Sequence, residues 1–185
     1  MEVTASFSLH LPAKSKLKVK KGDLVNTGDL VALIDGEVKI KSPFKGKITT
    51  ASKEKITISF SALEIKGKWG VGGQKIGSLV CLEKEEADLF DLNAELQDKL
   101  LVLFGCFNRG FWYKAASLGL AGIAALDLAE GFANEGLETF QEETDLPLIV
   151  WQDKDVFQPL WQIFKKNEGK EILIEGGEKR ILIPL

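Results

Sequence analysis

Two turns with the same residue order, six residues apart, constrain the fold of this chain most strongly. Gly22-Asp23 and Gly28-Asp29 each precede aliphatic residues, Leu24-Val25 after the first turn and Leu30 to Ile34 after the second. Further along, segment 42–48 reads Ser-Pro-Phe-Lys-Gly-Lys-Ile, and a proline three residues before a glycine marks another chain reversal. Closely spaced reversals between aliphatic runs predict compact, turn-rich β structure.

Four segments around these turns alternate apolar and polar residues, as half-buried strands do. They are Phe7 to Leu11, Leu17 to Val19, Val38 to Ile40 and Ile56 to Phe60. Their close spacing is typical of a small β sandwich or barrel and not of βαβ units. We therefore expect the N-terminal part of the chain to be an all-β domain.

The charge of the chain changes sign near residue 80. The 185 residues have a formal net charge of −3, but residues 1–80 hold 14 Lys, no Arg and 7 acidic residues, a net charge of +7, and the remainder carries −10. The strand-like alternation also stops at the acidic segment 83–88. We expect two domains, 1–82 and 98–185, joined by an acidic linker at 83–97.

The second domain is predicted to be a small α/β domain with a βαβ crossover, which makes the whole chain an α+β protein. Lys99 to Phe104 is an apolar run typical of a strand buried on both faces, and Asn108 can cap a helix that ends at Gly119. The elements expected after it are a strand at 120–128, a strand at 146–151, a helix that begins at Asp153 or Asp155 with Pro159 near its first turn, and a β pair at 171–175 and 180–184.

The first domain resembles the barrel-sandwich hybrids, a family that includes biotinyl and lipoyl carrier domains. The resemblance rests on Val19 to Ile34 and on segment 42–48, and it extends over about residues 5–82. In the carrier members, a lysine at the tip of the hairpin between these two motifs receives biotin or lipoate. Here the hairpin is short, Asp35-Gly36 is suited to its turn, and no lysine lies at the tip.

Lys39 is the nearest candidate for such a modification. It alternates with Val38 and Ile40, a pattern that favours an exposed strand residue over a modified one. We therefore expect the fold without its prosthetic group, and no other cofactor.

The second domain is similar to the protease-associated domains, small swivelling α/β modules. The similarity rests on segment 106–123, in which a Cys-Phe turn leads into a helix containing Lys and Ala and then into a second strand, and it covers about residues 98–175. Members of that family are mostly noncatalytic accessory modules, and the resemblance implies such a role here.

A glycine-rich loop, Gly70 to Gly77, has some likeness to a phosphate-binding loop. It lacks the Gly-Lys-Ser/Thr ending, and a strand pattern follows it where a phosphate site needs a helix N-terminus. We interpret it as a turn with close backbone contacts. Trp69, Gly72 and Gly73 form a candidate contact loop, although we favour a core role for Trp69.

Few residues are available for catalysis. His10 is the only histidine, so a Ser-His-Asp triad or a multi-histidine metal site is disfavoured. Cys106 is the candidate nucleophile, because Arg109 and Lys114 follow it closely and positive charge lowers a thiol pKa. A buried structural cysteine is the alternative. The acidic cluster at 135–145 matches no calcium loop, so we expect no metal site.

The sequence also bears on localisation. No apolar run approaches the roughly 18 to 20 residues that span a bilayer, and the first residues lack the pattern of a secretion signal. Cys81 and Cys106 do not suggest a disulfide framework. We expect a cytoplasmic protein with no membrane partner.

Two classes of function remain. We favour a noncatalytic interaction or scaffold module that binds an unknown protein partner or itself. The alternative is an RNA- or DNA-associated protein that uses a lysine face, but the first domain has no Arg, and aromatic residues are scarce among its lysines. A thiol enzyme centred on Cys106 is a distant third. The lysines that make up the candidate polyanion or partner face are Lys16, Lys18, Lys20, Lys39, Lys41, Lys45 and Lys47.

Overall fold

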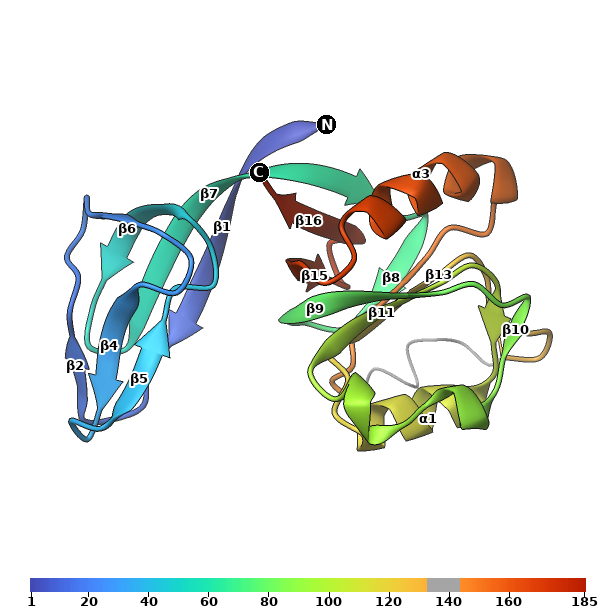
Figure 1. Cartoon of the computed structure of the whole chain (residues 1–185), viewed down its shortest axis with the longest axis horizontal. Helices are drawn as coiled ribbons and strands as arrows, with labels where there is room; N and C mark the ends of the chain where they lie inside the picture. The colour runs from blue at the N-terminus through green and yellow to red at the C-terminus, as the bar shows by residue number, and fades with distance from the viewer. Residues whose placement is uncertain (133–143) are drawn as a thin grey trace. The chain divides into compact units, whose positions relative to one another are not determined.

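The computed structural model describes residues 1–132 and 144–185. These residues form a mixed α and β protein in which most elements are strands, so the expected α+β class is confirmed. The chain divides into two compact units, residues 1–63 with 184–185, and residues 64–183 (Figure 1).

Two antiparallel sheets build the first unit. One has the strand order β3 (Leu24–Val25), β6 (Gly46–Ala51), β7 (Lys55–Lys66, of which the part up to Leu63 belongs to this unit) and β1 (Glu2–His10).

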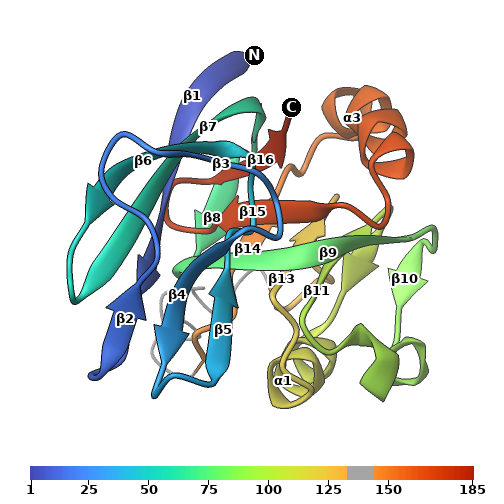
Figure 2. The same cartoon turned by 60° about the vertical axis from the view of Figure 1, so that its left-hand side comes forward.

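The other sheet has three strands, β2 (Ser15–Leu17), β4 (Leu30–Ile34) and β5 (Val38–Lys41), and Figure 2 shows β4 and β5 side by side. Val31 and Ala32 of this sheet pack with Ile48, Ile56 and Ile58 of the first, and all five are fully buried. The two sheets therefore share one hydrophobic core.

The two Gly-Asp turns fold in the same way. Gly22 and Gly28 have φ of 98° and 87°, which glycine adopts without steric cost. In each turn, the aspartate carboxylate accepts the backbone N–H three residues earlier, from Lys20 to Asp23 at 2.9 Å and from Asn26 to Asp29 at 2.7 Å. The shared residue order in the sequence thus encodes one repeated turn.

A single sheet forms the centre of the second unit. Strands β9, β11, β13 and β14 run parallel, β8 pairs antiparallel with β14, and β15 pairs antiparallel with β9 and β16. The strands in spatial order are β16 (Arg180–Pro184), β15 (Glu171–Glu175), β9 (Gln74–Leu82), β11 (Lys99–Leu103), β13 (Gly122–Ala125), β14 (Leu148–Val150) and β8 (Trp69–Val71).

Helices α1 (Arg109–Ser117) and α3 (Lys154–Lys166) cover opposite faces of this sheet (Figure 1). Their N-caps are Asn108 and Asp153, both among the expected caps. Pro159 is the sixth residue of α3, beyond the first turn in which we expected it. The β11, α1 and β13 segments make the predicted βαβ crossover, because β11 and β13 are parallel.

Aromatic residues fill the space under both helices. Phe111 and Trp112 of α1 are buried against Phe107, and Phe157 of α3 packs on Trp151 with ring centroids 5.0 Å apart. Aromatic side chains bury much apolar area each, so these clusters fix the helices to the sheet.

The boundary between the units differs from the expected one at residue 82. Residues 64–82 lie in the second unit, where β8 pairs with β14 and β9 pairs with β11 and β15. Period-2 alternation identifies a strand but not its partner, and β9 alternates like the strands of the first unit.

Segment 83–97 is also not the open linker that its charge suggested. It contains the short strand β10 (Glu86–Ala87), which pairs with β12 (Cys106–Phe107), and the 3₁₀ turns η1 (Leu89–Asp91) and η2 (Ala94–Leu96). Buried Ala87 and Leu92 fix this segment to the core of the second unit.

None of the helices within residues 1–132 and 144–185 has the length and apolar character needed to cross a membrane.

Candidate functional site

The outer face of the three-stranded sheet carries four lysines. Lys16 of β2 and Lys39 of β5 flank Leu33 of β4 in one row across the sheet. Lys18 and Lys41 lie two residues further along on the same sides, and side chains two apart in a strand point to the same face. We call Lys16, Lys18, Lys39 and Lys41, with Leu33 at the centre, the lysine face.

The electrostatic character of this face is uniform. All four lysines are exposed, and none of them forms an ion pair with any part of the chain that the structure describes. The neighbouring Lys14 and Asp35 pair at 3.8 Å, with both side chains largely exposed. An uncompensated set of cations attracts an acidic surface and steers its approach.

The structure does not bring all seven expected lysines together. Lys20 lies in the turn before β3, while Lys45 and Lys47 belong to the region of β6 in the other sheet. The lysine face therefore holds four of the seven.

Lys39, the candidate for biotin or lipoate attachment, is exposed on β5 and not at the hairpin tip. The tip is Asp35-Gly36, with φ of 50° and 83°, and Glu37 N–H donates to Ile34 O at 3.0 Å. Two successive positive φ values define a type I′ turn. This tight turn leaves no projecting loop for a carrier lysine.

A hollow lies on the outer face of the sheet formed by β3, β6, β7 and β1. It has a volume of about 550 Å³, and hydroxyl side chains of Thr4, Ser59 and Ser61 line it together with Lys45 and Lys47. Leu24, which also lines it, is 81% exposed. We did not predict a site at these serines and threonines, although their strict alternation along 4–8 and 57–61 marks one polar sheet face.

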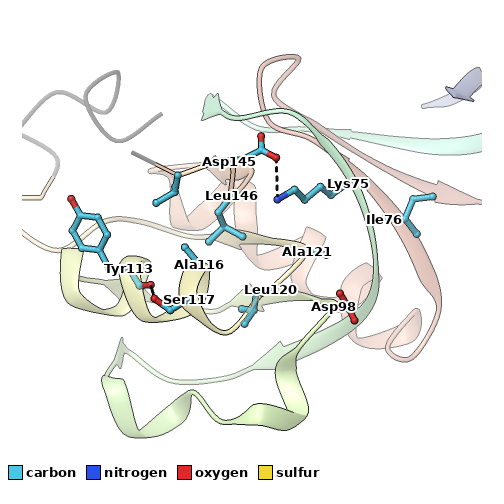
Figure 3. A pocket seen from close by; sticks show the side chains of 12 residues that line it. Lys75, Ile76, Asp98, Tyr113, Ala116, Ser117, Leu120, Ala121, Asp145 and Leu146 are labelled. Carbon is cyan, nitrogen blue, oxygen red and sulfur yellow. Dashed lines mark hydrogen bonds and ion pairs between the residues drawn. The ribbon is translucent and has the colours of Figure 1, made fainter. Parts of the chain in front are cut away.

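A cavity of the second unit has a volume of about 670 Å³. Lys75 and Asp145 form an ion pair of 3.4 Å at its wall, and Tyr113 and Ser117 of α1 lie along another side (Figure 3). Asp98 and the segment 119–121 place this cavity at the amino ends of β11 and β13. Ligands of open parallel sheets bind at the carboxyl ends, so its position does not favour an active site.

The glycine-rich loop makes close backbone contacts. Gly72 has φ of 89°, and Gly176 and Gly177 donate backbone N–H groups to Gly73 O and Gly72 O at 3.1 and 2.8 Å. A strand, β9, follows the loop, so it lacks the helix N-terminus of a phosphate site. Gly72 and Gly73 also line a hollow of about 240 Å³ with Glu175 and Glu178, and the negative charge of Glu178 opposes an anion there.

Trp69 in the same hairpin is half-buried against the core of the second unit. This agrees with the core role that we favoured for it. The ring of Trp69 is therefore held partly in this core and is only partly exposed in the candidate contact loop of Trp69, Gly72 and Gly73.

A polar cluster that we did not predict lies next to the glycine turn. Arg180 donates to both Glu64, at 3.2 Å, and Glu175, and Gln74 also donates to Glu175. Glu64 and Glu175 are each 9% exposed, and Glu64 and Gln74 come from a part of the sequence that is distant from Glu175 and Arg180. All the charges in this cluster are paired, so we assign it a structural role.

The environment of Cys106 is opposite to the expected one. Burial raises the pKa of its thiol, and the nearby carboxylates of Glu86 and Asp127 raise that pKa further. Arg109 instead donates to the Tyr113 hydroxyl at 2.9 Å, and Lys114 donates to Leu89 O at 2.5 Å. Among the described residues, no positive charge lowers the pKa of this thiol, which disfavours a thiolate nucleophile.

The remaining candidate groups add no catalytic pair. His10 ends β1 and is exposed. Residues 135, 138, 142 and 143 of the acidic cluster lie outside the described residues, and among the residues that are described no three His, Cys, Asp or Glu side chains gather as a metal site.

Comparisons with known proteins give little further guidance. No family model matches the chain, and no curated protein matches it. The solution NMR structure of a UPF0107 protein is similar in part, with 13% sequence identity and a TM-score of 0.44, and the match covers 65% of this chain and 99% of that chain. A likeness at this level assigns neither a fold family nor a function.

Proposed function

We propose that the protein is a noncatalytic binding module whose first unit docks on an acidic protein surface through the lysine face. The observation that carries the proposal is the row Lys16, Leu33 and Lys39, in which a half-buried leucine is flanked by two exposed, unpaired lysines. An apolar centre within a charged rim is the usual layout of a protein interface.

We further propose that the first unit is a barrel-sandwich hybrid without its prosthetic group, that the second is a swivelling α/β accessory module, and that the protein acts in the cytoplasm. Two antiparallel sheets around one core support the first assignment. The parallel βαβ crossover supports the second.

A protein partner fits this face better than a nucleic acid does. Residues 1–63 contain no arginine, and no aromatic residue lies in β2, β4 or β5. Nucleic-acid-binding sheets use aromatic side chains to stack bases and Arg to read them. The four lysines of this face supply positive charge but no group that stacks on bases.

Affinity purification from cells of the native host tests the proposal. The bait is the full chain, and the double variant Lys16→Glu, Lys39→Glu is compared with the matched double variant Lys53→Glu, Lys55→Glu, which makes the same charge change at exposed positions outside the face. We expect to recover acidic proteins that bind the wild type and the Lys53→Glu, Lys55→Glu control but do not bind the Lys16→Glu, Lys39→Glu variant. Partners that are retained by all three baits, or that nuclease treatment removes, would contradict a protein-binding role for the face.

A further inference from the structure

Strand β1 has an unprotected edge. It pairs with β7 over nine consecutive residues without a bulge, and β7 is its only strand partner in the described part of the chain. Natural proteins protect long free edges with lysine, proline or bulges, because an open ladder recruits another strand. The edge strands β2 and β5 of the other sheet carry lysine, whereas β1 has no Lys, Pro or Gly.

The backbone pattern shows which groups face the free edge. Leu11 N–H donates to Glu54 O at 2.8 Å, and this pair continues the β1 to β7 register, so the odd positions of β1 bond to β7. Ser61 O, opposite Thr4 in that register, accepts Leu185 N–H and so faces away from β1. The residues whose N–H and C=O groups therefore point to the free edge are Glu2, Thr4, Ser6, Ser8 and His10.

The sequence of β1 is complementary to itself in the antiparallel direction. With Ser6 placed opposite Ser6 of a second copy, Glu2 lies opposite His10, so an acidic residue meets a basic one at both ends. Thr4 then lies opposite Ser8 on the polar face, and the inward pairs are Val3 with Leu9 and Ala5 with Phe7. This register keeps polar side chains on one face and apolar side chains on the other, and it pairs all nine residues.

We propose that two copies of the chain associate through antiparallel pairing of β1 with β1, centred on Ser6. The strands β3, β6, β7 and β1 of the two copies then lie in one continuous sheet. Every edge-facing N–H and C=O of β1 acquires a partner, and such main-chain bonds supply the affinity in strand-addition interfaces. This inference does not depend on the lysine face, which belongs to the other sheet.

Cysteine cross-linking tests the register. Directly opposite residues of an antiparallel pair have Cα atoms about 4.5 to 5.5 Å apart, within the range that a disulfide bridges. The single variant Ser6→Cys should therefore form a covalent dimer on mild oxidation. Thr4 lies four residues from its own symmetry mate along the strand, about 13 Å, so the matched variant Thr4→Cys should not.

The chain retains Cys81 and Cys106, so the oxidised wild type sets the background. A covalent dimer specific to Ser6→Cys, and formed also by a mixture of Thr4→Cys with Ser8→Cys, supports the proposed register. Equal dimer formation by Ser6→Cys and Thr4→Cys, or none above the wild-type background, would overturn it.

The mass of the protein in solution provides a second test that needs no cross-link. We expect sedimentation equilibrium to show a concentration-dependent species of twice the 20.4 kDa chain mass. Ser6→Pro removes an edge-facing N–H that β7 does not use, and edge strands tolerate proline there. It should therefore raise the dimer dissociation constant at least about tenfold while the unfolding curve stays near that of Ser6→Thr.

The pairing of Glu2 with His10 can be checked by charge exchange. Glu2→Lys should weaken the dimer, and adding His10→Glu to it should restore the dimer. A wild type that remains monomeric at all concentrations, or a Ser6→Pro variant that dimerises normally, would refute the β1 interface.

Discussion

Single residues decide which chemistry this chain supports. The two thiols are held protonated: burial and the Glu168 carboxylate raise the pKa of Cys81 to about 12, outweighing the opposite effect of Lys165. Cys106 is shifted in the same direction by burial and by its acidic neighbours. The closeness of Arg109 to Cys106 in the sequence suggested an activated thiol. The pKa depends on where the charged side chains point, however, and only the folded structure shows this.

The raised pKa of Cys81 predicts a specific pH dependence. At pH 10, its thiol should carry about a hundredfold less thiolate than an ordinary cysteine, so alkylation followed by mass spectrometry should be correspondingly slow in the folded chain. Alkylation of Cys81 that levels off near pH 9, as for a free thiol, would contradict this environment.

The same shift predicts how stability changes with pH. Below pH 9, the thiol is protonated in both the folded and the unfolded chain, so it has no effect. Between pH 9 and about 12, the unfolded chain loses this proton and the folded chain keeps it, so the free energy of unfolding falls. Cys81→Ser should show a smaller decline over this range when compared with the wild type by urea unfolding.

At the scale of secondary-structure elements, local sequence signals predicted individual helices and strands correctly but did not predict which strands pair with one another. The caps Asn108 and Asp153, the buried strand at 99–103 and the β pair β15 and β16 all follow from local sequence. The assignment of β9 failed because its parallel partner β11 lies beyond segment 83–97, and no alternation pattern states which sheet a strand joins. The lysine face was predicted in composition, but its row through Leu33 depends on the register of three strands.

The turn between β15 and β16 supports the glycine-rich hairpin, and this contact can be tested. A Cβ atom added at Gly176 would lie 1.8 Å from Val71 O, whereas one added at Gly177 would lie 3.4 Å from Gly72 O. Gly176→Ala should therefore lower the free energy of unfolding by about 3 kcal/mol. Gly177→Ala is the matched control and should lower it much less; equal losses in urea unfolding would contradict the close packing.

At the scale of the whole molecule, the two units differ in charge, and the central strand β11 differs in burial from the edge strand β5. Residues 1–63 hold eleven lysines and six acidic residues, a net charge of +5, while the rest of the chain carries −8. In the second unit, residues 100–103 of β11 are all at most 1% exposed. In the first unit, every residue of β5 is exposed or only partly buried. Binding surfaces are often built on such less stable elements.

Hydrogen exchange should therefore be uneven along the chain. Amides of β11, which has bonded strands on both sides, should exchange most slowly, and those of the edge strands β2 and β5 should exchange faster. A partner bound to the lysine face would slow exchange in β2 and β5, because it restricts their opening, and leave β11 unchanged. Mass spectrometry of the full chain measures both effects, and slower exchange in β5 than in β11 without a partner would contradict this distribution of stability.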